Sequence, residues 1–171
     1  MKHMTTNSVM DYYPTRKSAS FSLIDRKEPV VYDNAFDLQM LTPENVAFFE
    51  KNGYLLIQNL LSREELNALS DELVKLTGDD KKHSDEYILE PHHGDVRSIF
   101  YVHQNSSVFR DLASDYRIVN VIRQLLGSDV YITQSRINLK PGFEGKEFYW
   151  HSDFETWHSE DGMPSMRAIS C

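Results

Sequence analysis

The pattern of apolar and polar residues along positions 42–57 predicts a helix followed by a short strand. Thr42 followed by Pro43 is typical of a helix N-terminus, because the threonine hydroxyl caps free backbone N–H groups and proline suits the first turn. Gly53 suits the end of this helix. The run at 54–57, Tyr-Leu-Leu-Ile, is aromatic or aliphatic throughout and predicts a buried strand.

A second helix is predicted from Ser62 onward, with clear signals at both ends. Ser62 and Glu65 have the spacing of a capping box, and Gly78 suits the helix end. Leucines recur between these ends at intervals of three and four residues, at Leu66, Leu69, Leu73 and Leu76. This spacing places them on one face of the helix, which we expect to pack on the core as scaffold rather than to bind a partner.

Shorter patterns predict the segments before and after these helices. Residues 1–40 are polar and irregular, which indicates an arm that lies over a domain or is partly mobile. Residues 79–86 are charged and predict a solvated loop. The elements expected next are a strand over residues 98–103 and helices over residues 108–113 and 117–126, the second of them ending at Gly127.

Residues 130–140 alternate between two kinds of side chain, which predicts a strand with two distinct faces. One face carries polar groups at four successive alternate positions, namely Gln134, Arg136, Asn138 and Lys140. The other face becomes apolar towards its end. The polar face is either exposed to solvent or the polar wall of a ligand cavity inside a barrel. Residues 141–145 predict a turn, and residues 148–153 predict the returning strand of a hairpin.

Composition and charge exclude several classes of partner. The chain has 171 residues, of which 40% are hydrophobic, so it is the size of one domain with a core. A net charge of −8 argues against unaided nucleic-acid binding and against docking on an anionic membrane surface. Neither a signal peptide nor an apolar run of bilayer length is present in the sequence, so a cytoplasmic location is expected. The single cysteine, Cys171, excludes disulfides within the chain.

The last residues do not have the pattern of a domain end. Residues 167–171, Arg-Ala-Ile-Ser-Cys, resemble the opening of a strand, and no turn, helix cap or polar tail follows them. Because natural domains seldom end within a strand, we expect further sequence after Cys171.

His151 and Asp153, in the predicted returning strand, carry the most chemical information. Residues two apart on a strand point to the same side, so this imidazole and this carboxylate suit adjacent positions on one metal ion. A histidine from a distant strand would complete the 2-His-1-carboxylate triad of non-haem iron(II) oxygenases. A His-x-Asp pair alone is a weak signal that an ordinary hydrogen bond explains equally well. The aromatic residues around it, including Trp150 and Trp157, favour the metal site, because they exclude water.

Other histidines are weaker candidates for the third ligand. They are His92, His93, His103 and His158. His92 and His93 lie in a polar loop and suit the surface. His158 is too close in sequence to reach the opposite corner of an octahedron, and His103 better fits a structural role on its strand. We therefore expect none of them to bind the metal.

Several long, ordered segments resemble one known family. They are residues 95–100, 126–131, 134–143 and 148–164, the last including the run His-Ser-Asp-Phe-Glu-Thr-Trp-His at 151–158. They are similar to the ectoine hydroxylases, a family within the phytanoyl-CoA dioxygenase-like superfamily of iron(II)- and 2-oxoglutarate-dependent dioxygenases. A looser similarity extends from about Pro29 to the end of the chain.

This resemblance implies a reaction and a role for individual residues. The implied roles are iron(II) binding for His151 and Asp153, 2-oxoglutarate binding for Asn138 and Lys140, and ectoine binding for Gln134 and Trp157. The implied reaction uses dioxygen to convert ectoine to 5-hydroxyectoine, a compatible solute made in osmotic or heat stress. The family's third iron ligand, a histidine, and its arginine for 2-oxoglutarate lie downstream of position 171. Three of the implied residues share the polar strand face, which favours the cavity wall over the solvent face.

The resemblance also implies a fold. The expected class is α+β, the N-terminal part of a double-stranded β-helix (jelly-roll or cupin-like) with flanking helices and a missing C-terminal end. Residues 1–40 would form the arm and residues 41–171 the N-terminal portion of the dioxygenase domain. The alternatives are a related dioxygenase acting on another small substrate, or a non-catalytic fragment or interaction module. The oligomeric state stays open, with a homodimer as one candidate.

Overall fold

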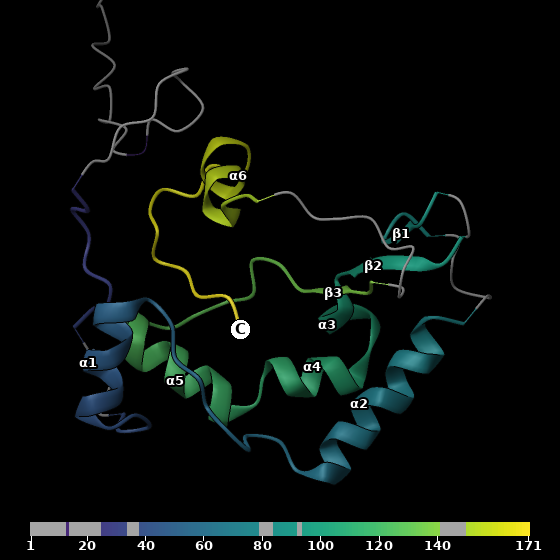
Figure 1. Cartoon of the computed structure of the whole chain (residues 1–171), viewed down its shortest axis with the longest axis horizontal. Coiled ribbons are helices and arrows are strands. Elements are labelled where there is room, and N and C mark those ends of the chain that lie inside the picture. The colour runs from purple at the N-terminus through teal and green to yellow at the C-terminus, as the bar shows by residue number, and fades with distance from the viewer. Residues whose placement is uncertain (1–12, 14–24, 34–37, 79–83, 92–93, 141–149) are drawn as a thin grey trace, which may run out of the picture. The chain divides into compact units, whose positions relative to one another are not determined.

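The computed structural model describes residues 13, 25–33, 38–78, 84–91, 94–140 and 150–171. The chain divides into two compact units, one of residues 1–29 and 149–171 and the other of residues 30–148. The described elements of the larger unit are α1 (Pro43–Asn52), α2 (Arg63–Leu76), β1 (Tyr87–Leu89), β2 (Val96–Phe100), α3 (Val102–Asn105), α4 (Ser107–Ala113), α5 (Tyr116–Leu126) and β3 (Arg136–Asn138) (Figure 1). The smaller unit contains α6 (Asp153–Ser159).

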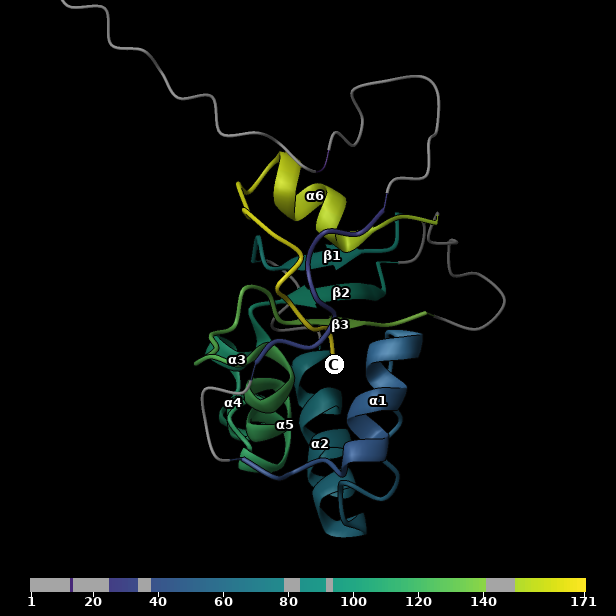
Figure 2. The same cartoon turned by 90° about the vertical axis from the view of Figure 1, so that its left-hand side faces the viewer.

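The three strands of the larger unit form an antiparallel sheet with β2 in the centre. In Figure 2 the helices of this unit lie to one side of the three strands. A hydrophobic cluster joins strand and helices: Leu76 of α2, Val96 and Ile99 of β2, and Val102 of α3. Ile99 is completely buried, and Ile137 of β3 packs against the same cluster. Ile99 and Ile137, which are opposite each other in the strand register, therefore share one face of the sheet, and Ser98 and Asn138 share the other.

The helices expected from local sequence signals are confirmed. Thr42 caps α1 by accepting a hydrogen bond from the backbone N–H of Asn45, and Gly53 ends that helix with a positive φ of 76°. Ser62 and Glu65 make both hydrogen bonds of the capping box of α2. The helices expected near 108–113 and 117–126 are α4 and α5.

The prediction of a buried strand at residues 54–57 is wrong. These residues form no strand, and Tyr54 and Leu56 are 62% and 74% exposed. An apolar run becomes a strand only when a neighbouring strand satisfies its backbone, and no described strand pairs with this one. The leucine stripe of α2 is buried only towards its C-terminal end, where Leu76 enters the core, whereas Leu66 is 51% exposed.

The strands expected over 98–103 and 130–140 are present, but with different bounds. The strand expected over 98–103 is β2 at Val96–Phe100, because Tyr101 adopts a positive φ of 55° and the chain turns into α3. The strand expected over 130–140 is regular only at Arg136–Asn138. The alternation is confirmed there, since Arg136 and Asn138 are exposed and Ile137 is half-buried. The turn expected at 141–145 lies outside the described residues.

The segment before α1 is tied to the C-terminal end of α5. The backbone N–H of Tyr32 donates to the carbonyl of Leu125 at 2.9 Å, and that of Leu41 donates to Oε1 of Gln124 at 2.9 Å. Gly127, which ends α5, lies so close to the backbone of this segment that a Cβ at Gly127 would be 1.9 Å from the carbonyl oxygen of Asp33. The predicted boundary between an arm and a domain near residue 40 stays a prediction.

Substitution of Gly127 by alanine should destabilise the fold by more than about 2 kcal/mol, because its φ of +60° strains any side chain and its Cβ would clash with backbone. Gly53→Ala is the matched control: its φ is +76° but nothing lies within 4 Å of a Cβ, so about 1 kcal/mol is expected. Urea unfolding of the protein encoded by the complete reading frame measures both. Equal losses would contradict the close approach of Asp33.

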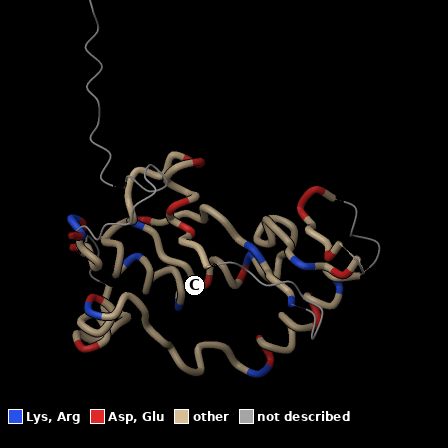
Figure 3. Tube along the Cα trace, turned by 45° about the horizontal axis from the view of Figure 1, so that its top comes forward, with Lys and Arg blue, Asp and Glu red and all other residues tan. Residues whose placement is uncertain are grey.

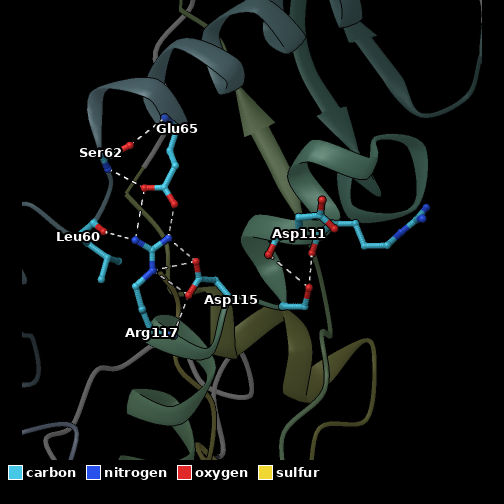
Figure 4. A network of polar contacts seen from close by, with 8 residues as sticks. Leu60, Ser62, Glu65, Asp111, Asp115 and Arg117 are labelled. Carbon is cyan, nitrogen blue, oxygen red and sulfur yellow. Dashed lines mark hydrogen bonds and ion pairs between the residues drawn. The ribbon is translucent and has the colours of Figure 1, made fainter.

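Arg117 joins the N-terminal ends of α2 and α5 (Figure 4). Its guanidinium donates to both carboxylate oxygens of Asp115, the N-cap of α5, to Glu65 of α2 and to the carbonyl oxygen of Leu60 at 2.8 Å. The same Glu65 carboxylate accepts the backbone N–H of Ser62 in the capping box. Hydrogen bonds from Arg117 are the main reason that the pKa of each carboxyl, Asp115 and Glu65, lies below its ordinary value.

Replacement of Arg117 by alanine should lower the Tm by several degrees at pH 7, because two helix caps lose a shared partner. Because the pKa values of Glu65 and Asp115 are lower in the folded state than in the unfolded state, their ionised forms stabilise the wild type at pH values above the unfolded-state pKa. This contribution is lost as the pH falls through the folded-state pKa values. The difference in Tm between wild type and variant should therefore shrink from pH 7 to pH 3. Lys75→Ala, which removes an exposed ammonium group that pairs with Glu72, is the control and should change the Tm little. A difference that grows on acidification would contradict this role.

Charged residues of both signs are interspersed along the trace of the larger unit (Figure 3). The described part of the chain contains no helix with both the length and the apolar character needed to cross a bilayer.

Candidate functional site

His151 and Asp153 lie next to each other in the smaller unit. The distance between Nε2 of His151 and Oδ1 of Asp153 is 3.2 Å, and their side chains are 55% and 44% exposed. The prediction of a strand over residues 148–153 is wrong for the residues that the structure describes. Residues 150–152 are irregular, and Asp153 is the first residue of α6. Acidic residues in the first turn, Asp153 and Glu155, favour a helix N-terminus here.

The spacing of this pair fits two neighbouring ligands of one metal ion. Ligand atoms about 2.1 Å from a metal, at adjacent octahedral positions, are roughly 3 Å apart. The observed 3.2 Å fits that geometry and fits an ordinary ion pair equally well. No cluster of three or more potential ligands occurs among the described residues, so the pair alone supplies two of the three ligands of an iron triad.

His158 is engaged locally on α6. Its Nδ1 lies 2.6 Å from the carbonyl oxygen of Met163, and its ring stacks on Phe154 with the centroids 5.4 Å apart. The ring of Tyr13 packs edge-on against both. This aromatic cluster supports α6. It agrees with the expectation that His158 has no ligand role, an expectation that remains a prediction. Trp157, on the same helix, is half-buried.

The predicted cosubstrate residues lie in and next to β3 in the larger unit. Asn138 ends the strand, and its side-chain Oδ1 accepts a hydrogen bond of 2.9 Å from the hydroxyl of Ser98 on β2. Lys140 follows two residues later and is exposed. Arg136, on the same face, places its guanidinium 5.6 Å from the centre of the Phe100 ring. The polar face is thus a row of donors backed by the apolar cluster.

Gln134, the predicted ectoine contact of this unit, precedes β3 and is exposed. Its neighbour Ser135 is fixed by His103: Nδ1 of His103 lies 2.5 Å from the Ser135 hydroxyl, and the backbone N–H of His103 donates to the same oxygen at 3.3 Å. His103 lies on α3 rather than on the predicted strand. That it has a structural role and binds no metal stays a prediction. His92 and His93 lie outside the described residues.

Ser98 and Ser135 were not predicted from sequence. Each is a serine with a partner more than 30 positions away, so no local pattern indicates it. The strand Val96–Phe100 contains two polar residues, Arg97 and Ser98, so its sequence does not single out Ser98.

The chain belongs to the phytanoyl-CoA dioxygenase (PhyH) family, whose model matches residues 49–171. Within that class, the curated relatives that it matches include ectoine dioxygenases. The one from Bordetella bronchiseptica is 51% identical over 162 residues, which are 94% of this chain and 53% of the relative. The one from Halomonas elongata is 48% identical over 163 residues, covering 94% of this chain and 49% of the relative. The resemblance inferred from the sequence segments is confirmed.

Solved structures show the same likeness in three dimensions. EctD from S. alaskensis with bound Fe matches with a TM-score of 0.86 and 43% identity, over 92% of this chain and 57% of that chain. EctD from S. alaskensis with 2-oxoglutarate and 5-hydroxyectoine matches with a TM-score of 0.85, also at 43% identity, over 92% and 56%. The chain thus has the fold of the corresponding part of EctD and spans about half the length of the curated relatives it matches.

Proposed function

We propose that the protein containing this chain is an iron(II)- and 2-oxoglutarate-dependent dioxygenase that hydroxylates ectoine to 5-hydroxyectoine. The observation that carries the proposal is the 3.2 Å spacing of His151 Nε2 and Asp153 Oδ1 in a chain of the phytanoyl-CoA dioxygenase family. The names of the relatives, and the EctD structure with 2-oxoglutarate and 5-hydroxyectoine, support the choice of cosubstrate and product.

His151 and Asp153 would hold the metal, since a neutral imidazole and a carboxylate are the ligand types of the 2-His-1-carboxylate triad. Iron(II), when bound, supplies the activation of dioxygen that couples decarboxylation of 2-oxoglutarate to hydroxylation of a C–H bond. The balance is ectoine, 2-oxoglutarate and dioxygen giving 5-hydroxyectoine, succinate and carbon dioxide. One further histidine ligand is needed, which the described residues do not supply.

Asn138 and Lys140 would bind 2-oxoglutarate. Its oxygens can only accept hydrogen bonds, so its binding site needs N–H donors, and an amide and an ammonium group on one strand face supply them. Gln134 and Trp157 would contact ectoine, a small zwitterion. A tryptophan ring is a favourable neighbour for the delocalised positive charge of its amidinium group.

The finer architecture is proposed on the same grounds. The likeness to EctD supports the N-terminal part of a double-stranded β-helix with flanking helices. In such a fold the polar face of β3 would line the cavity. We place the enzyme in the cytoplasm, without nucleic-acid or membrane partners and with a homodimer as the candidate assembly.

The proposal is tested by the choice of substrate. The protein encoded by the complete reading frame is supplied with iron(II), 2-oxoglutarate and dioxygen, and succinate release is measured with ectoine, proline or an acyl-CoA. Stimulation by ectoine alone is expected. Stimulation by proline or the acyl-CoA instead would indicate the related dioxygenase, and no stimulation by any of them would favour a non-catalytic module.

A further inference from the structure

Ser98 and Asn138 face each other across the central part of the sheet. Ser98 of β2 is opposite Asn138 of β3 in the strand register. The next pair along the two strands, Arg97 and Leu139, is joined through the backbone: the N–H of Leu139 donates to the carbonyl of Arg97 at 2.8 Å. Backbone-bonded and non-bonded pairs alternate along an antiparallel ladder, so Ser98 and Asn138 form a non-bonded pair. Side chains approach each other most closely at such pairs, which explains the 2.9 Å bond between Oγ and Oδ1.

This hydrogen bond determines which end of the Asn138 amide faces outward. Ser98 is buried, with 3% of its surface exposed, and a buried hydroxyl needs an acceptor for its hydrogen. Oδ1 of Asn138 is that acceptor. With Oδ1 directed at Ser98, the two N–H donors of Nδ2 point away from it, and Asn138 is exposed. The buried hydroxyl thus keeps the donor end of the amide on the open side.

We infer that Ser98 is a positioning residue for the cosubstrate, which holds the Asn138 amide with its N–H donors presented to a carboxylate of 2-oxoglutarate. The inference rests on the proposed function. A carboxylate oxygen attracts an N–H group and repels an amide oxygen, so an Asn138 that rotated freely would offer the wrong atom in part of its population. Lys140, two residues beyond the end of β3 and also exposed, would supply charge, whereas Ser98 supplies orientation.

The experiment compares Ser98→Thr with Ser98→Val in the protein encoded by the complete reading frame. Threonine and valine have nearly the same shape, and both suit a strand, so any effect of the added methyl group is common to the two variants. Only the hydroxyl differs. The Kd for 2-oxoglutarate, measured by titration calorimetry, should be on the order of 10-fold higher for Ser98→Val than for Ser98→Thr. The KM for 2-oxoglutarate should follow it, with kcat and the KM for ectoine similar in both.

A double-mutant cycle separates positioning from a merely structural role. If Ser98 acts through Asn138, the Thr-to-Val difference in Kd should disappear in an Asn138→Ala background. A difference that persists there would overturn the inference, and so would equal Kd values in the wild-type background. Binding of 2-oxoglutarate without turnover of ectoine would refute the proposed substrate. The comparison of Kd values would still test the role of Ser98. A wild-type protein that binds no 2-oxoglutarate would overturn both proposals.

Discussion

Replacement of His151 by alanine should reduce both iron binding and ectoine-dependent succinate release by more than about 100-fold. Changes to residues that merely support a ligand already cost metal sites 10- to 100-fold, and loss of a ligand should cost at least as much. Asp153 would then be left without the imidazole that lies 3.2 Å away. Metal analysis after anaerobic loading of the protein from the complete reading frame measures iron content, and the succinate assay measures turnover.

His158→Gln is the matched control for His151→Ala. It removes an imidazole from the same unit, five residues beyond Asp153, and glutamine retains an amide donor for the carbonyl of Met163. Iron content should be unchanged in this variant. If His151→Ala retained full iron content as well, the 3.2 Å contact would be an ordinary ion pair and the proposed metal site would be wrong.

Replacement of Lys140 by methionine should raise the KM for 2-oxoglutarate by roughly 10- to 100-fold. Methionine keeps most of the length and the apolar stem of lysine but removes its charge, and a hydrogen bond to a charged group contributes about 1.5–3 kcal/mol. The KM for ectoine should change little. Steady-state kinetics at varied 2-oxoglutarate measures the effect, with Lys51→Met in the last turn of α1 as control. An unchanged KM would remove Lys140 from the cosubstrate site.

Helix ends could be predicted from the sequence because their signals are local. Thr42, Gly53 and the pair Ser62 and Glu65 each satisfy backbone groups within four residues of themselves. The run at 54–57 failed because a strand depends on a partner elsewhere in the chain, about which the run itself carries no information. Likewise, the end of β2 depends on the positive φ of Tyr101, which is not a glycine and gives no warning in the sequence.

Contacts in the candidate site between residues close in sequence could be predicted, whereas contacts that depend on the register between two strands could not. The proximity of His151 and Asp153 was expected from a strand and is found at a helix N-terminus, because a separation of two residues keeps them close in either case. Alternation predicted the exposed side of Arg136 and Asn138 correctly. The partner of Asn138 was not predictable, since a shift of one residue between β2 and β3 would place another side chain opposite it.

Turnover under ¹⁸O₂ shows whether the protein hydroxylates ectoine with dioxygen and 2-oxoglutarate. The protein from the complete reading frame is incubated with iron(II), 2-oxoglutarate, ectoine and labelled dioxygen, and the products are analysed by mass spectrometry. Equal amounts of succinate and 5-hydroxyectoine are expected, with one labelled oxygen atom entering each. Succinate formed without any hydroxylated ectoine, or hydroxyectoine whose new oxygen comes from water, would contradict the proposed function.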